Sequence, residues 1–231
     1  MIRRLHMKSH PLQRFLALIV IAAAAASGLA CDSLYYKTMK KFGKEKRDIL
    51  VNRVKDARKS QDEAQQQFKS ALERFQAIVE TRGGSLEDKY NKLNDELQRS
   101  EDRSRQVKDR VNAVRDVSKD LFNEWNDELG KYSDRKLRQE SERELRETKR
   151  RTDALIASMA RAQARVEPVL KPLRDRVLFL KHNLNARALG ALTGELATMR
   201  TDVDELVADM QRSIAEADAF IQDMEKATTD E

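Results

Sequence analysis

The stretch that decides the fold runs from Leu50 to Ile78 and reads LVNRVKDARKSQDEAQQQFKSALERFQAI. Its apolar and small residues recur at alternating intervals of four and three, with one polar interruption. The residues at these positions are Leu50, Val54, Ala57, Gln61, Ala64, Phe68, Ala71, Phe75 and Ile78. This spacing keeps one stripe on a single helix face for about eight turns, which is typical of a coiled-coil seam.

Three further segments carry the same spacing, and short turns separate them. Gly83 and Gly84 end the first segment, and Ser85 is placed to cap the second. We therefore predict helices over about 44–81, 86–131, 134–184 and 186–227. Short turns between long helices force neighbours to be antiparallel, so the sequence predicts an all-α fold, an elongated antiparallel coiled coil or four-helix bundle. The bundle is assigned to residues 44–228.

Four features of the predicted helices leave structural questions open. Pro168 and Pro172 remove backbone donors from the third helix, where we expect a kink rather than an end. The turn before the fourth helix lies anywhere between Asn183 and Gly194. Trp125 continues the apolar spacing of the second helix, which favours core packing over a binding anchor. Polar residues on the seams are expected to fix register or allow close approach, with a lined cavity as the alternative; they are Gln61, Ser100, Ser104, Ser118, Thr148 and Thr152.

Composition argues against the common classes of enzyme. Charged residues make up 36% of the chain and aromatic residues 5%, a profile of long helices with narrow apolar seams. Beyond residue 30 the chain has one histidine, His182, and one cysteine, Cys31, so histidine triads and Cys/His zinc sites are excluded. No glycine-rich phosphate loop occurs. We expect no catalytic residue, no metal and no cofactor.

The N-terminus follows the pattern of a secretory signal. A basic stretch precedes the apolar run 15–26, and the small-residue region 27–30 then leads to Cys31. Residues 1–30 are accordingly interpreted as a lipoprotein signal peptide and residues 31–43 as a lipidated tether. Translation from Met7 would leave a shorter basic stretch, and an uncleaved signal anchor is the alternative to cleavage.

Cys31 is the candidate lipidation site. Leu29-Ala30-Cys31 resembles the end of a bacterial lipoprotein signal, although Leu29 stands one place later than the usual leucine. Acyl chains on the thiol would anchor the protein firmly without a transmembrane helix, because each buried methylene contributes about 0.8 kcal/mol. Asp32 resembles the residue that retains lipoproteins at the inner membrane, which slightly favours that membrane over the outer one. The body would then face the periplasm of the cell envelope.

Net charge separates the expected partners from the excluded ones. The chain carries +6 overall, but four basic residues precede Cys31, so the processed chain would have 41 basic and 39 acidic residues. This near balance gives no basis for nucleic-acid binding. The expected partners are membrane lipid through Cys31, unidentified envelope proteins and a second copy of the chain. The expected role is a structural or interaction protein, a scaffold or adaptor, with a membrane-surface-binding or membrane-remodelling module as the alternative.

One polar cluster near a predicted turn is the candidate partner or ligand patch. It consists of His182, Asn183, Asn185 and Arg187. The competing interpretation is an ordinary helix end, where asparagine side chains cap backbone groups.

Four segments resemble one known family. They are 46–51 with 54–58 (KRDILV and VKDAR), 90–96 (YNKLNDE), 145–151 (LRETKRR) and 180–187 (LKHNLNAR). The chain is similar in these segments to bacterial predicted lipoproteins that share domain of unknown function 2959. The resemblance implies an exported helical protein and implies no activity.

Overall fold

A computed structural model describes residues 46–81, 83–183 and 186–229. This part of the chain contains helices and no strand, which confirms the predicted all-α class. Residues 47–231 form a compact unit of their own. The signal peptide and tether predicted for residues 1–43 lie outside the described residues. The helices are α3 (Lys46–Glu80), α4 (Leu86–Leu129), α5 (Arg135–Ala164), α6 (Val166–His182) and α7 (Ala186–Thr229).

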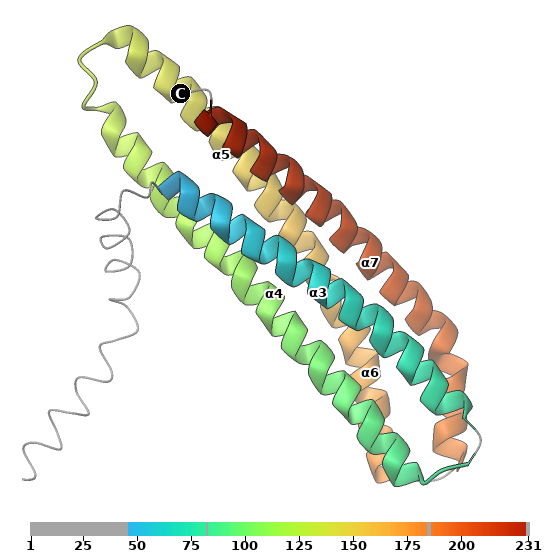
Figure 1. Cartoon of the computed structure of the whole chain (residues 1–231). Coiled ribbons are helices and arrows are strands. Elements are labelled where there is room, and N and C mark those ends of the chain that lie inside the picture. The colour runs from blue at the N-terminus through green and yellow to red at the C-terminus, as the bar shows by residue number, and fades with distance from the viewer. Residues whose placement is uncertain (1–45, 82, 184–185, 230–231) are drawn as a thin grey trace, which may run out of the picture. The chain divides into compact units, whose positions relative to one another are not determined.

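The helices form an antiparallel bundle in which α5 and α6, placed end to end, act as one long helix (Figure 1). The α5–α6 pair packs against α4 on one side and α7 on the other. Inter-helix ion pairs place α3 between the same two neighbours, with Glu63–Arg103 at 2.6 Å to α4 and Arg58–Asp218 at 3.0 Å to α7. The cross-section is therefore that of an up-down-up-down four-helix bundle.

Local sequence explains where the helices begin and end. Gly83 and Gly84 follow α3 with φ of 85° and 81°, a left-handed conformation that a residue with a Cβ adopts at a cost. The Ser85 Oγ accepts a hydrogen bond from the Asp88 backbone N–H at 3.1 Å, which confirms the predicted cap of α4. Asp134 caps α5 in the same way by accepting from two backbone N–H groups.

The third helix differs from the single kinked helix expected over 134–184. It is interrupted at Arg165, so that α5 ends at Ala164 and α6 begins at Val166. Because proline has no N–H, Pro168 cannot donate to the Ala164 carbonyl four residues before it, and the helix opens there. Pro172 lies inside α6, which continues through it. Asn183 is the C-cap of α6, α7 begins at Ala186, and Gly190 and Gly194 lie within α7.

The core follows the predicted stripes. In α3, eight of the nine stripe residues are buried, and Val79 is buried in place of Ile78. Leu50, Val54 and Phe68 are at most 2% exposed. Burying such side chains contributes roughly 1.5–3 kcal/mol each, so the seams supply most of the driving force for bundle formation.

Most buried polar side chains on the seams are satisfied inside their own helices. Ser100 donates to the Glu96 carbonyl at 2.9 Å, and Thr152 donates to the Thr148 carbonyl at 2.8 Å. Gln61 behaves differently, because its Oε1 accepts from Ser213 Oγ of α7 at 2.9 Å. Its amide nitrogen is buried and lacks a hydrogen-bond partner. The Gln61–Ser213 pair therefore sets the relative register of α3 and α7 at the cost of an unmet donor.

Glu96 is the most deeply buried carboxylate of the inter-helix ion pairs. Its side chain is 5% exposed, and it accepts from Arg74 of α3 at 2.7 Å and from Arg99 of α4 at 2.5 Å. Burial raises the pKa of Glu96, but hydrogen bonds from Arg99 and Arg74 outweigh burial and hold the pKa below its usual value of 4.5. The ion pair of Glu96 with Arg74 therefore holds α3 against α4 while the Glu96 carboxylate is ionised.

Replacing Glu96 with Gln is expected to lower the free energy of unfolding at pH 7 by about 1 kcal/mol, because both arginines are half exposed and regain water. A lowered folded-state pKa stabilises the fold above pH 4.5, and this contribution is lost as the pH falls through the folded pKa. The free energies of unfolding of the wild type and of Glu96→Gln, measured with urea, should therefore become equal in acid. The exposed Glu73→Gln is the control, and an equal loss in that variant would contradict the assignment.

Candidate interaction surfaces

The structure places the predicted polar patch at the α6–α7 turn but describes it incompletely. His182 is the last residue of α6 and is exposed. Asn183 caps α6, and its Nδ2 donates to the Phe179 carbonyl at 3.1 Å. Asn185 lies outside the described residues, and Arg187 is described only as part of α7. Asn183 thus has the helix-capping contact of an ordinary helix end.

The lipidation site and the proposed sorting residue, Cys31 and Asp32, lie outside the described residues. Among the helices that the structure does describe, none has the length and apolar character needed to cross a membrane. The described side chains also include no group of three or more His, Cys, Asp or Glu residues arranged to hold a metal ion.

An exposed apolar pair near the end of α6 was not singled out by the sequence patterns. Leu178 is 52% exposed and Phe179 46% exposed. They stand between the buried seam residues Val177 and Leu180, so the signal available in the sequence was two large apolar residues off the seam. Phe179 also borders a shallow pocket of about 540 Å³ with Lys171, Pro172, Asp175 and Arg176. We call Leu178 and Phe179 the α6 apolar pair.

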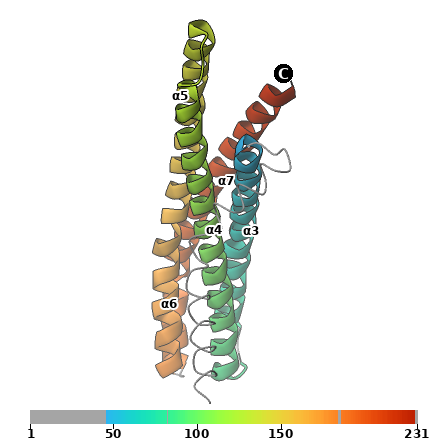
Figure 2. The ribbon, with the colours of Figure 1, turned by 90° about the vertical axis from the view of Figure 1, so that its left-hand side faces the viewer.

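At the opposite end of the bundle, the α4–α5 hairpin extends past the other helices (Figure 2). The ion pairs Asp56–Arg110 and Glu63–Arg103 set the register of α3 against α4. In this register Arg47, the second residue of α3, lies level with Lys119. The remaining helical residues of α4, 120–129, project about 15 Å farther at 1.5 Å per residue.

A groove of about 550 Å³ lies where the hairpin leaves the ends of α3 and α7. Trp125 is half-buried in its wall, and its Nε1 donates to Ser141 Oγ at 2.8 Å. The expectation that Trp125 packs in the core is therefore corrected: it is a half-buried residue in the wall of a groove that Arg47 of α3 and Phe220 of α7 also line. Leu137 lines the same groove and is 54% exposed.

Charges along the groove are mostly paired. Arg151 of α5 is hydrogen-bonded to Glu147, and it also lies 3.4 Å from Asp223 of α7. The hydrogen bond and charge of Arg151 hold the pKa of Glu147 below its usual value. These contacts join α5 to α7 at the point where the two helices separate.

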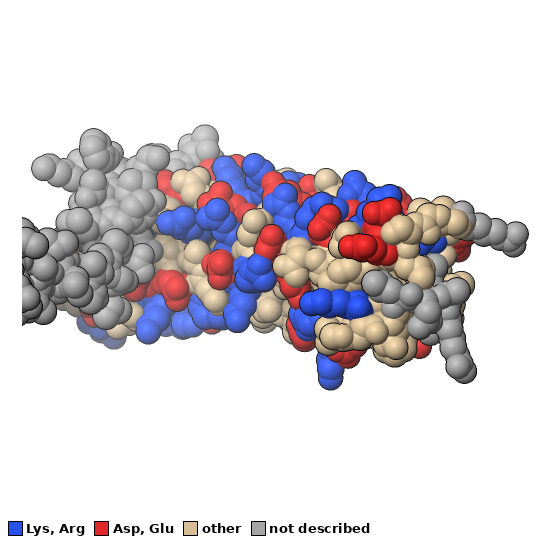
Figure 3. Space-filling view, turned by 90° about the horizontal axis from the view of Figure 1, so that it is seen from below, with Lys and Arg blue, Asp and Glu red and all other residues tan. Residues whose placement is uncertain are grey.

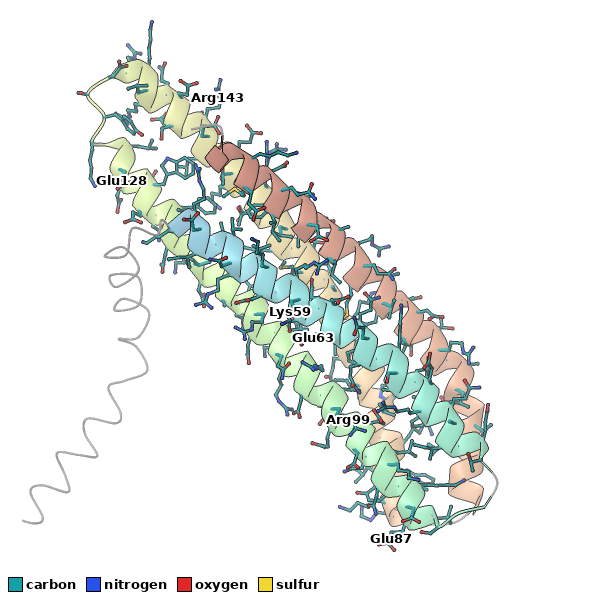
Figure 4. All side chains as sticks on the ribbon, in the orientation of Figure 1. Lys59, Glu63, Glu87, Arg99, Glu128 and Arg143 are labelled. Carbon is teal, nitrogen blue, oxygen red and sulfur yellow. The ribbon has the colours of Figure 1, made fainter. Side chains whose placement is uncertain are left out.

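Elsewhere the surface carries intermixed charges. Figure 3 shows Lys and Arg side chains alternating with Asp and Glu side chains over one face of the molecule. Several are neighbours on one helix, such as Lys59 and Glu63 at 4.0 Å, both labelled in Figure 4. Such exposed pairs stabilise a helix by a few tenths of a kcal/mol, so they are typical of a hydrated helix surface and do not indicate a ligand site.

A family model described as a protein of unknown function (DUF2959) matches residues 35–224. The chain belongs to this family. The match spans both ends of the bundle, so the α6 apolar pair and the α4–α5 hairpin both lie within the DUF2959 region. It begins four residues after Cys31. No curated protein matches the chain.

Proposed function

We propose that this DUF2959 protein is a lipoprotein of the bacterial cell envelope, acylated at Cys31, that holds a protein partner away from the membrane as a scaffold or adaptor. The signal-like residues 1–30 and the Leu29-Ala30-Cys31 sequence support the anchor. Asp32 slightly favours the inner membrane, with the body facing the periplasm. The proposed role is not enzymatic, since the chain beyond residue 30 offers a single histidine, which is exposed at a helix end.

The α6 apolar pair carries the scaffold proposal. α3 has 35 residues and runs from the end where the chain joins the bundle to the far end, a length of about 50 Å. Leu178 and Phe179 lie near that far end, only a few residues before α6 terminates at His182. Two adjacent large apolar side chains, each about half exposed, with Phe179 also beside a shallow pocket, suit a protein contact. A partner bound there would be separated from the anchored end by nearly the whole bundle.

Site-specific photo-crosslinking in intact cells tests this role. A photoreactive residue at position 178 is expected to give a discrete adduct with another envelope protein, and Phe179→Ser is expected to weaken the adduct strongly. The matched control carries the photoreactive residue at Lys108, an exposed position midway along α4.

Two results would contradict the adaptor role. The first is equal labelling from positions 178 and 108, or labelling that Phe179→Ser leaves unchanged. The second is an adduct of twice the chain's mass, which would assign this face to self-association.

The second candidate function is binding to the membrane surface. The α4–α5 turn favours it, because exposed apolar side chains lie there beside basic ones. This turn is at the end of the bundle where α3 begins (Figure 1).

A further inference from the structure

The tip of the α4–α5 hairpin combines exposed apolar side chains with basic ones. We define the tip as residues 130–138. Tyr132 is 42% exposed and Leu137 is 54% exposed, and together with Leu178 and Phe179 they are the large apolar side chains found exposed in the described chain. Four basic residues and one acidic residue accompany them: Lys131, Arg135, Lys136, Arg138 and Asp134.

Two of the tip cations have no ionic partner in the described part of the chain. Arg135 and Lys136 are exposed in the first turn of α5, where the helix dipole disfavours positive charge. Lys131 pairs only loosely with Glu128 at 3.7 Å, whereas Arg138 bonds Glu142 at 3.1 Å. Unpaired cations in the first turn destabilise an isolated helix, but they would be stabilised where the tip contacts an anionic surface.

Acidic residues stand behind the tip rather than on it. Glu128, labelled in Figure 4, lies at the end of α4, and the acids Glu140, Glu142 and Glu144 follow on α5. The segments next to the tip, 120–129 and 139–144, carry seven acidic residues and one basic residue, Arg143, so the hairpin is basic at its end and mainly acidic just behind it. This segregation favours end-on contact with an anionic surface, because a hairpin lying flat would bring its carboxylates against the same charge.

Chain connectivity puts the tip on the membrane side of the bundle. The α4–α5 turn and the start of α3 lie at the same end of the bundle (Figure 2). Lys46 follows Cys31 by fifteen positions, and such a segment spans at most about 50 Å when fully extended. A lipid on Cys31 therefore keeps the tip within reach of the same bilayer.

We propose that the α4–α5 tip is a second membrane contact, in which Tyr132 and Leu137 enter the interface of an anionic phospholipid bilayer while Arg135 and Lys136 bind its phosphate groups. This inference rests on the proposed envelope location, and it adds a contact independent of the acyl chains. Tyrosine and basic side chains are the residues that favour this interface. The hairpin would hold the bundle upright on the membrane through two points of attachment.

Co-sedimentation with vesicles tests the tip directly. The protein used is residues 46–231, because residues 47–231 form a compact unit and the basic residues before Lys46 would bind anionic lipid themselves. Vesicles contain either equal parts phosphatidylglycerol and phosphatidylcholine, or phosphatidylcholine alone. At low salt the wild type is expected to bind the anionic vesicles and to lose this binding on neutral ones.

Arg135→Glu combined with Lys136→Glu is expected to weaken binding about tenfold or more, since each basic residue near an anionic surface contributes roughly a factor of five. Acids in the first turn suit the helix dipole, so the fold is retained. The control is Lys92→Glu with Lys108→Glu, which makes the same charge change at exposed α4 positions at least about 30 Å from the end of α4.

The depth to which the tip enters the bilayer is measured with Tyr132→Trp in a Trp125→Phe background. This variant has one tryptophan, at the tip. Brominated lipid is expected to quench its fluorescence in anionic vesicles. Equal binding by the tip and control variants, unquenched fluorescence from the tip, or no preference of the wild type for anionic vesicles would overturn the proposal. Acylation of Cys31 is absent from this experiment, so its outcome is independent of the anchor.

Discussion

Serine in place of Cys31 is expected to abolish fatty-acid incorporation into the protein. Lipid transfer to a lipoprotein forms a thioether, and a serine hydroxyl cannot supply the thiolate nucleophile that this reaction requires. The chain has no other cysteine, so no second site can replace Cys31. Metabolic labelling with a fatty acid, followed by isolation of the protein, measures the effect as complete loss of label. The variant should also retain residues 1–30 or be released without lipid.

Asp32→Ser is the matched control for this experiment. It leaves the thiol in place, so labelling should equal that of the wild type. If Asp32 acts as a retention signal, the protein should shift from the inner to the outer membrane in a density gradient. Labelling that persists in Cys31→Ser would contradict the assignment of the anchor.

Replacing the Gln61–Ser213 pair with Leu and Ala is expected to raise the free energy of unfolding by about 2–3 kcal/mol. The Gln61 amide nitrogen is buried without a partner, and an unmet donor of this kind costs about 1–3 kcal/mol. Both side chains are fully buried, so leucine at position 61 adds apolar burial in the same volume. Urea unfolding followed by circular dichroism measures the gain.

Ser100→Ala is the control, because the Ser100 hydroxyl is satisfied by the Glu96 carbonyl of its own helix. Its stability should change little. A loss of stability in the Gln61→Leu, Ser213→Ala variant would show that the inter-helix hydrogen bond outweighs the unmet donor. A broadened unfolding transition would instead indicate that the pair is needed for a single register.

Much of the bundle could be predicted because a four-three spacing specifies which helix face is buried. That spacing identified Leu50, Phe68 and their neighbours correctly, and only the last position of the first stripe moved, from Ile78 to Val79. Capping residues are equally local, so Ser85 could be assigned from sequence. The position of the helix interruption was harder, since Pro168 acts on the carbonyl of Ala164 rather than at its own position.

The groove beside the α4–α5 hairpin and the α6 apolar pair could not be predicted in the same way. The exposure of Leu137 and the half-burial of Trp125 depend on how far α4 and α5 extend past α3 and α7, and that offset is set by turn positions and packing rather than by any one seam. Leu178 and Phe179 do carry a sequence signal, since both lie off the stripe that buries Val177 and Leu180. In both places the residue types are ordinary, and their exposure follows from which other helices pack against them.

The intact mass of the N-terminal peptide, taken from wild-type protein extracted from membranes, tests most directly whether a lipid on Cys31 anchors the helical bundle to the envelope. We expect a peptide that begins at Cys31 and carries a diacylglyceryl group on its thiol. An unmodified Cys31 with residues 1–30 still attached would contradict the proposed lipid anchor and would indicate a signal-anchored protein.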